Sequence, residues 1–182
     1  IMPSGPLFIT DAFIGIDPSV EQLVKVTRAA ARRVQDFGIK PKVALLSHSN
    51  FGSSRAPAAI KMREAAEILR HSEAGYEVDG EMHADAALSA TIRDALNPDS
   101  TLSDAANLLV MPSLDAANIA VELLRSVSNA LMIGPILSGT SRVAHVLTPS
   151  STVKGIFNMS AIAVADVRRY KQERERRSSQ AD

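Results

Sequence analysis

The chain of 182 residues contains no cysteine and no tryptophan, and only 4% of its residues are aromatic. The absence of cysteine excludes a disulfide framework, a thiolate nucleophile and a cysteine-based zinc site. The formal net charge is zero, which argues against a nucleic-acid partner because phosphate binding requires a basic surplus. The sequence has no run of about 18 apolar residues, so we expect no membrane span or membrane partner. No signal peptide opens the chain, and the expected location is the cytoplasm.

Apolar residues make up 46% of the chain and charged residues 22%. These proportions predict a soluble globular domain, whose core must be built from Leu, Ile, Val, Ala and Met because aromatics are scarce. The four His are scattered and show no zinc-ligand spacing. The chain begins with Ile1 followed by Met2, which indicates either a tag remnant before the domain or a piece of a longer polypeptide.

Short apolar runs alternate with segments of helical periodicity along the chain. We expect six strands, at residues 7–10, 43–46, from 77, 107–111, 130–133 and 144–147. The expected helices cover residues 18–38, a segment from Ala56-Pro57, 84–96, 115–124 and a long segment from Ser151, with Asp17 and Asp115 as caps.

Crossover helices of this length predict an α/β fold, a three-layer αβα sandwich with a mostly parallel sheet. The strand order should reverse near a cleft between the loops that begin at Ser47 and Gly134. We assign residues 1–167 to one lobe and residues 168–182 to a charged tail. The tail is expected to be a frayed, solvated end, with a basic partner-binding arm as the alternative.

The segment Ser47–Ser54 follows a buried strand and precedes a helix. Its hydroxyls, its backbone N–H groups near Gly52 and the helix N-terminus behind it suit an anion such as a nucleotide phosphate. The candidate binding residues here are Ser47, Ser49, Asn50, Gly52 and Ser53. The alternative is an ordinary serine-rich loop between a strand and a helix.

A second candidate loop is Gly134–Gly139, in which two glycines allow a ligand to approach the backbone closely. Its candidate binding residues are Gly134, Pro135, Ile136 and Gly139, and we expect Thr148 and Pro149 to line the same cleft. The alternative is that the glycines serve turn geometry alone. His48 and His145 flank the expected cleft, either as polar contacts or as ordinary satisfied side chains.

Three motif-like segments follow one another along the chain, at Val78–Ala87, Leu108–Ile119 and Ile133–Gly139. They resemble motifs in the second half of phosphate acetyltransferases, and the Ser47–Ser54 loop resembles another. The resemblance implies a lobe of the phosphate-acetyltransferase-like, or isocitrate/isopropylmalate dehydrogenase-like, fold.

A cluster of possible metal ligands in the sequence consists of Asp79, Glu81, His83 and Asp85. The resemblance implies instead a structural element whose carboxylates are bonded by backbone and a neighbouring loop, and no metal site. Asp115 and Asn118 are expected to make cap and turn bonds.

Active members of that family carry Asp-Leu-Ser-Arg-Gly and a downstream Asp where this chain reads His145 to Ile156. The Ser aligns with Thr148, the Arg with Pro149 and the downstream Asp with Gly155. Acyl transfer from acetyl phosphate to CoA requires a base for the thiol and a cation for phosphate. Gly155 cannot act as a base and Pro149 carries no charge, although Thr148 keeps a hydroxyl. The resemblance therefore implies a scaffold with no catalytic residues.

The segments Leu147–Val153, Leu108–Pro112 and Asn158–Ala161 resemble the C-terminal domain of bacterial hybrid NADP-dependent malic enzymes. The resemblance implies a regulatory domain that binds acetyl-CoA as an effector, forms homo-oligomers and follows a malic enzyme domain in the same chain. NADP and a divalent metal are then expected only in that upstream part, with no cofactor in this domain. The alternatives are an active phosphate acetyltransferase lobe and a purely structural dimerisation module.

Overall fold

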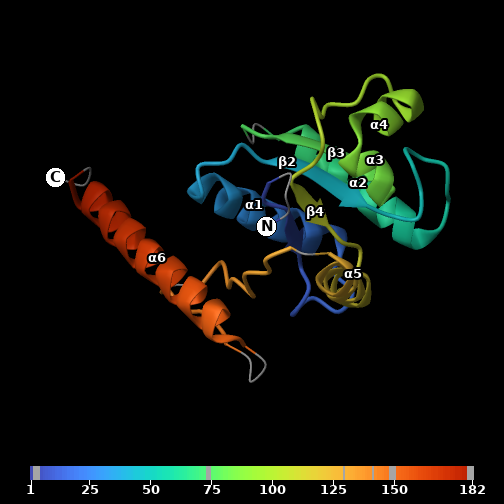
Figure 1. Ribbon diagram of the computed structural model, residues 1–182. Helices are drawn as coiled ribbons and strands as arrows, with labels where there is room; N and C mark the ends of the chain where they lie inside the picture. The colour runs from blue at the N-terminus through green and yellow to red at the C-terminus, as the bar shows by residue number, and fades with distance from the viewer. Residues whose placement is uncertain (2–4, 73–74, 129, 141, 148–150, 180–182) are drawn as a thin grey trace. The chain divides into compact units, whose positions relative to one another are not determined.

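The computed structural model describes residues 1, 5–72, 75–128, 130–140, 142–147 and 151–179 (Figure 1). The chain divides into two compact units. One spans Met2–Ala130, and the other combines Ile1 with Leu131–Asp182.

The unit Met2–Ala130 contains a four-stranded parallel sheet, with the strand order β1-β4-β2-β3 within the described residues. An α/β fold with a parallel sheet is therefore confirmed. Its elements, in chain order, are β1 (Phe8–Thr10), α1 (Val20–Asp36), β2 (Lys42–Leu46), α2 (Pro57–Arg70), β3 (Glu77–Met82), α3 (Ala84–Leu88), α4 (Ala90–Leu96), β4 (Leu108–Val110) and α5 (Leu114–Val127).

Alternate residues of β2 face two different hydrophobic clusters, as expected for a strand buried on both faces. Val43 and Leu45 pack with residues of α1 and α2, including Leu23 and Met62. Ala44 and Leu46 pack with residues of α3 and α5 on the other face. The sheet is thus the middle of three layers, α1 and α2 on one side and α3 and α5 on the other.

Two helices, α1 and α5, begin at serines rather than at the expected aspartates. Ser19 caps α1 in a reciprocal pair with Gln22, in which Gln22 N donates to Ser19 Oγ and Ser19 N donates to Gln22 Oε1. Ser113 caps α5 through its hydroxyl alone, which accepts from Ala116 N. The predicted caps Asp17 and Asp115 are therefore wrong. Asp17 lies two residues before the serine that caps α1, and Asp115 already lies inside the first turn of α5. Pro57 occupies the first turn of α2, as predicted.

The helix expected over residues 84–96 is two short helices, α3 and α4, which meet at Ser89. This residue has extended backbone angles, and its hydroxyl accepts a bond from Ile92 N and caps α4. A side chain that competes for backbone bonds in this way favours a helix boundary over a helix interior.

The second unit lacks the two strands expected in it. Leu131 exchanges backbone bonds with the N-terminal residue Ile1, and the rest of 130–133 and 144–147 belongs to no strand. A short apolar run fixes neither a strand nor its partner, and these runs find no ladder among the described residues.

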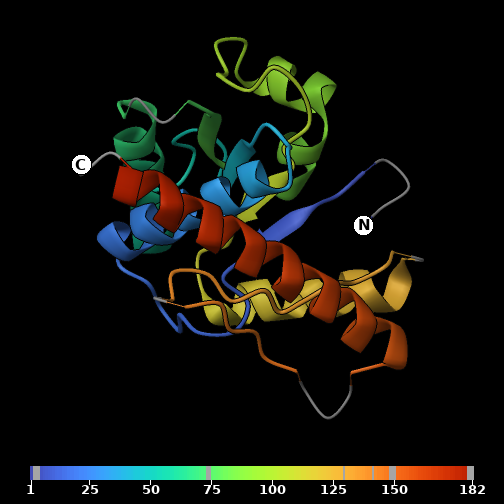
Figure 2. The ribbon, with the colours of Figure 1, turned by 90° about the vertical axis from the view of Figure 1, so that its left-hand side faces the viewer.

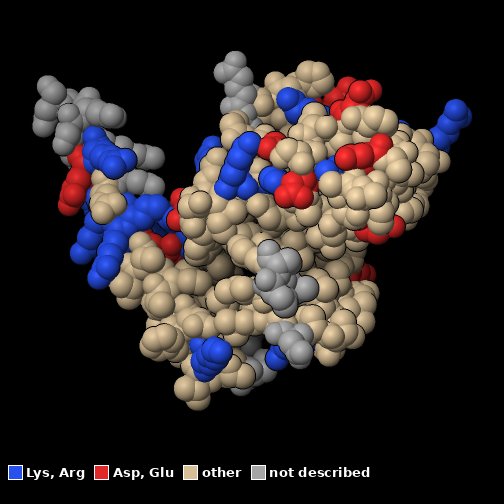
Figure 3. Space-filling model, turned by 45° about the horizontal axis from the view of Figure 1, so that its top comes forward, with Lys and Arg blue, Asp and Glu red and all other residues tan. Residues whose placement is uncertain are grey.

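The helix α6 (Val153–Ser179) is the one long element of the second unit's described part (Figure 2). It begins close to the predicted position but continues through the segment predicted to be frayed. Lys, Arg, Gln and Glu are good helix formers, and their run after Arg168 explains the continuation. Lys and Arg side chains gather on this part of α6, at the left of Figure 3. In the described part of the chain, no helix is long and apolar enough to cross a membrane.

Candidate functional site

The carboxyl end of β4 is the place where neighbouring connections leave the sheet on opposite faces. The connection after β2 leads to α2, on the face of Leu23 and Met62, whereas that after β4 leads to α5 on the other face. In open α/β sheets ligands gather at such a point, outside the carboxyl ends of the strands. The Ser47–Ser54 loop, which follows β2, lies at this edge.

A buried carboxylate, Glu81, organises this loop from the end of β3. Its Oε1 accepts bonds from Ser49 Oγ at 2.7 Å and from Gly52 N at 2.9 Å. Arg63, one turn and a half into α2, donates to both carboxylate oxygens, from Nε and Nη2, each at 2.9 Å. The Glu81 side chain has no exposed surface, while that of Arg63 is one-third exposed. Two donors predicted for a ligand, Ser49 and Gly52, are thus bonded to a carboxylate of the chain itself.

The serine hydroxyls form an ordered chain of donors. Ser49 is fully buried and gives its one hydroxyl proton to Glu81. Ser53 Oγ must therefore be the donor in its 3.0 Å bond to Ser49 Oγ, and it accepts in turn from Asn50 N. Ser49 Oγ also accepts from Ser54 N at 3.0 Å. Among the four serines of the loop, the exposed Ser53 sits at the outer end of this chain.

Backbone bonds join the same loop to the end of β3. Ser47 N donates to Met82 O, and Phe51 N donates to Glu81 O. Asn50 contributes its side-chain oxygen, which accepts from His83 N at 2.7 Å. The structure therefore brings the five candidate residues of this loop together, around the last residues of β3.

Hydrogen bonds and the cation Arg63 stabilise the charged form of the buried Glu81. Burial acts to raise the pKa of Glu81, but the bonds from Arg63, Gly52 and Ser49 outweigh it and hold the pKa below its ordinary value. The bond to Glu81 in turn raises the pKa of Arg63. A carboxylate and a guanidinium joined at two points form a fork with fixed geometry.

An irregularity in β3 places Glu81 in this position. Leu45 of β2 pairs with Gly80, but the next residue, Leu46, pairs with Met82, so Glu81 is the extra residue of a β-bulge. Gly80 has φ 143°, in a region that favours glycine. The bulge removes Glu81 from the regular alternation of side chains along the strand and aims its carboxylate at the loop.

The other carboxylates of the suspected metal cluster are bonded elsewhere. Asp79 accepts from Gly80 N, Ser100 Oγ and Thr101 N, and Asp85 accepts from Ala86 N. His83 is exposed and precedes α3. The interpretation that backbone and a neighbouring loop satisfy Asp79 and Glu81 is confirmed. In the part of the chain that the structure describes, no three His, Asp or Glu side chains are placed to hold a metal ion.

A lysine crosses from α2 to the end of β4. Lys61 Nζ lies 3.0 Å from Pro112 O and 2.5 Å from the carboxylate of Asp17. These two bonds tie the connection after β1 to the connection after β4. Asp115 and Asn118, the acidic and amide residues just beyond, are exposed on α5.

The second candidate loop lies in the other unit. Gly134 and Gly139 both have positive φ, 150° and 84°, and a Cβ on Gly139 would meet no atom within 4 Å. Thr148 and Pro149 lie outside the described residues. Gly155 lies in the first turn of α6, where its N–H donates to Thr152 Oγ1 at 3.0 Å.

His145, the histidine predicted beside the cleft, has a specific partner in this unit. Its Nε2 lies 2.9 Å from Asp166 Oδ2 of α6, and Arg169 Nη2 lies 3.2 Å from the other oxygen of Asp166. The His145 and Asp166 side chains are 7% and 10% exposed. The pair holds the segment before residue 148 against α6.

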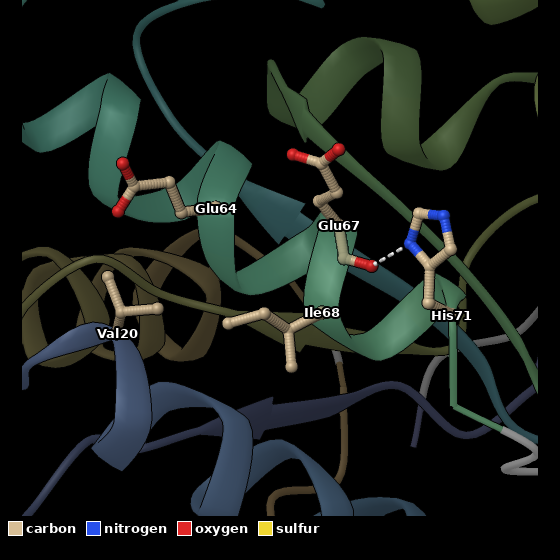
Figure 4. A pocket seen from close by; sticks show the side chains of 5 residues that line it. All are labelled: Val20, Glu64, Glu67, Ile68 and His71. Atoms are coloured by element: carbon tan, nitrogen blue, oxygen red, sulfur yellow. Dashed lines mark hydrogen bonds between the residues drawn. The ribbon is translucent and has the colours of Figure 1, made fainter.

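A hollow of about 520 Å³ lies elsewhere, between α1 and α2 (Figure 4). It is lined by Val20, Glu64, Glu67, Ile68 and His71, and His71 Nδ1 bonds to Glu67 O. The hollow includes none of the candidate residues, and four of its five lining residues are exposed, so it does not compete with the edge of the sheet.

Sequence reasoning missed Arg63. The available signal was the pair Asp79 and Glu81 inside a segment predicted to be a strand, together with Arg63 in the preceding helix. A buried carboxylate requires a cation or several hydrogen-bond donors, and Arg63 on the neighbouring helix α2 is the cation within its reach.

Comparison with known proteins decides the family. The family described as phosphate acetyl/butaryl transferase matches residues 1–164. The chain belongs to the phosphate acetyl/butaryl transferase family. It is 48% identical over 167 residues to an NADP-dependent malic enzyme of Escherichia coli, which covers 91% of this chain and 22% of the relative. It is 37% identical over 161 residues to a phosphate acetyltransferase of Paracoccus denitrificans, covering 87% of this chain and 50% of the relative.

A solved structure supports the same assignment. A phosphotransacetylase from Staphylococcus aureus superposes with a TM-score of 0.80 at 27% identity, over 86% of this chain and 49% of that one. The chain thus spans about a fifth of the malic enzyme and half of the phosphate acetyltransferases. It is a phosphotransacetylase-like domain, homologous to a region of malic enzymes.

Proposed function

We propose that this domain is a regulatory module of an NADP-dependent malic enzyme, which binds acetyl-CoA and does not transfer acyl groups. The observation that carries the proposal is the pairing of two facts. The chain is more similar to the malic enzyme of Escherichia coli than to the phosphate acetyltransferase of Paracoccus denitrificans. It also has Thr148, Pro149 and Gly155 where the family resemblance expects Ser, Arg and Asp.

The parent protein would then decarboxylate malate oxidatively to pyruvate, with NADP and a divalent metal bound upstream of this domain. The effector would act by linkage, because acetyl-CoA shifts the enzyme only if it binds two of its states unequally. We expect inhibition, since acetyl-CoA lies downstream of the pyruvate that malate oxidation supplies.

The Ser47–Ser54 loop is the proposed contact for the phosphates of CoA. The Ser49 hydroxyl and the Gly52 N–H both donate to Glu81, so these two groups act by fixing the loop and not by contacting the ligand. The exposed Ser53 and Arg55 remain on its outer side. The proposal that Gly134–Gly139, Thr148 and Pro149 complete the site stays a prediction.

Enzyme kinetics of the full-length parent protein test the proposal. The rate of malate-dependent NADP reduction is measured with and without acetyl-CoA, for the parent, for Ser49→Ala and for Gly139→Leu. The open space around Gly139 leaves room for the larger side chain, although its positive φ adds strain. We expect both variants to respond less to acetyl-CoA, and Ser126→Ala, on the exposed side of α5, to respond normally. A parent enzyme indifferent to acetyl-CoA contradicts the proposal.

The second candidate function is an active phosphate acetyltransferase lobe. The membership of the chain in the transferase family favours it. Formation of acetyl-CoA from acetyl phosphate and CoA by the unmodified protein would establish it in place of the regulatory function.

We also propose self-association through α6. The candidate contact residues, which share one side of this helix, are Ile156, Met159, Ile162 and Ala163. Met159 is buried, but Ile156 and its neighbour Phe157 are 43% and 72% exposed. Apolar side chains exposed this far are typical of interfaces. Light scattering should give a mass of two or more chains, and Phe157→Glu should lower it. A monomer at high concentration contradicts this part of the proposal.

A further inference from the structure

Glu81 and Arg63 present an anion and a cation on the same side of the Ser47–Ser54 loop, with unequal access to solvent. The carboxylate is fully covered, whereas the guanidinium side chain is 33% exposed. Glu81 uses both of its oxygens within the network. The group of this pair that a ligand can reach is therefore Arg63.

Gly52 leaves the guanidinium uncovered. A Cβ atom at this position would lie 3.8 Å from Arg63 Cζ and 4.0 Å from Nε and Nη2. Gly52 itself is exposed and has φ 93°, a conformation that larger residues seldom adopt. The loop thus passes over Arg63 at a residue without a side chain.

We propose that Arg63 is the cation through which the Ser47–Ser54 loop binds phosphate groups, and that Glu81 is the counter-ion that limits this affinity. The proposal rests on the function proposed above in taking CoA phosphates as the physiological ligand. The loop orders itself on the Glu81 carboxylate, and Arg63 cancels the negative charge that would otherwise repel a phosphate lying outside Gly52.

If the proposal holds, removing the charge of Glu81 and removing the charge of Arg63 should change the affinity for an anion in opposite directions. A purely structural ion pair predicts changes in the same direction. Removing the charge of Glu81 leaves an uncompensated cation beside the loop and should tighten the binding of an anion. Removing the charge of Arg63 leaves a buried anion there and should weaken it. If the pair only holds the loop in shape, both changes break the same contact and weaken binding alike.

The test uses the full chain and two probes, acetyl-CoA and inorganic pyrophosphate, with dissociation constants measured by calorimetry at low ionic strength. We expect Glu81→Gln to bind pyrophosphate at least about threefold more tightly than the wild type, and Arg63→Gln at least about threefold more weakly, as a charge within several ångströms requires. The double variant, which restores a neutral pair, should fall between them. Arg63→Lys keeps the charge while losing the fork, and should stay closer to the wild type than Arg63→Gln does.

A matched control is available at the other end of β3. Lys40 and Glu77 form an ion pair at 2.7 Å beside the first residue of that strand. Lys40→Gln and Glu77→Gln change the net charge of the protein by the same amounts and should leave the dissociation constants unchanged. Hydrogen exchange of the amides of residues 50–54 reports in each variant whether the loop keeps its structure.

The outcomes separate this inference from the proposed function. If both single variants weaken binding, or the double variant binds more weakly than either, the pair is only structural and the inference is wrong. If the wild type binds neither probe, both the inference and the proposed function fail. Binding of pyrophosphate with opposite shifts, but no binding of acetyl-CoA, upholds the inference and contradicts the proposed ligand.

Discussion

Gly80 of β3 lies directly against Leu45 of β2, so closely that a Cβ atom on Gly80 would be 2.7 Å from Leu45 O and 3.0 Å from Leu45 Cβ. The bulge that sends Glu81 toward the loop begins at this contact. Gly80→Ala should therefore separate the two strands where the candidate site is built.

We expect Gly80→Ala to lower the free energy of unfolding by about 2–4 kcal/mol, through the clash and the strained backbone together. Gly38→Ala is the control, because Gly38 also has a positive φ, 74°, but a Cβ there meets no atom within 4 Å. Gly38→Ala should lower the free energy of unfolding by about 1 kcal/mol. Urea denaturation of the two variants measures the difference, and equal losses would show that the contact with Leu45 is unimportant.

The stability of the fold in acid should depend on Glu77. Burial acts to raise its pKa, but the bonds from Lys40 and from Ser103 N and Oγ outweigh it and lower the pKa from 4.5 to about 2. A carboxyl whose pKa is lower in the folded state stabilises the fold above its unfolded pKa. This contribution, at most about 3 kcal/mol, is lost as the pH falls from about 4.5 to about 2.

Glu77→Gln should remove that part of the pH dependence. Thermal denaturation between pH 2 and pH 7 would then show a shallower loss of stability for the variant than for the wild type. Glu122→Gln, on the exposed side of α5, should follow the wild-type curve. Parallel curves for all three proteins would contradict the assignment.

The hydroxyl of Ser49 should matter for the order of the loop more than for direct contact with a ligand. Ser49→Ala removes the bonds to Glu81, Ser53 and Ser54 N at a fully buried position. We expect a loss of about 1–3 kcal/mol in stability and faster hydrogen exchange at residues 50–54. Ser126→Ala, which removes an exposed bond to Glu122 O, should change neither. Unaltered hydrogen exchange at residues 50–54 in Ser49→Ala would show that the hydroxyl of Ser49 does not order the loop.

The chain should show no phosphate acetyltransferase turnover in an assay of acetyl-CoA formation from acetyl phosphate and CoA. The triple variant Thr148→Ser, Pro149→Arg, Gly155→Asp tests which groups are missing. A Cβ at Gly155 would lie 3.3 Å from Thr152 Oγ1, so the aspartate requires a shift of a few tenths of an ångström at that contact. Activity that appears only in the triple variant, even far below that of an active enzyme, would support the alignment of the lost site.

The sheet of the first unit could be predicted because its strands are apolar on both faces. Val43–Leu46 and Leu108–Val110 are such strands, and the helices between them show clear periodicity. Helix boundaries at Ser19, Ser89 and Ser113 were less predictable, since Ser and Asp are both good caps and only geometry decides between them. The runs at 130–133 and 144–147 were misassigned because an apolar run of four residues does not specify a partner.

The Ser47–Ser54 loop was predictable as a polar loop after a buried strand, but its hydrogen bonds were not. The same serines suit a phosphate or a carboxylate, and the sequence does not show that Glu81 supplies one from within. Nor does it show the bulge at Gly80 that turns Glu81 out of the strand alternation. Such long-range pairing depends on the register of β2 and β3, which is a tertiary property.

The two-faced burial of β2 bears on the lengths that this strand can tolerate. Deletion of one residue from Lys42–Leu46 would exchange the faces of every side chain beyond the cut, so that leucine would take the place of Ala44 against α3 and α5. It would also pull Ser47 one step back from Met82 O. Natural relatives of this domain should therefore vary in length in their surface connections and keep β2 at a constant number of residues, and a library of single-codon deletions should show the same boundary.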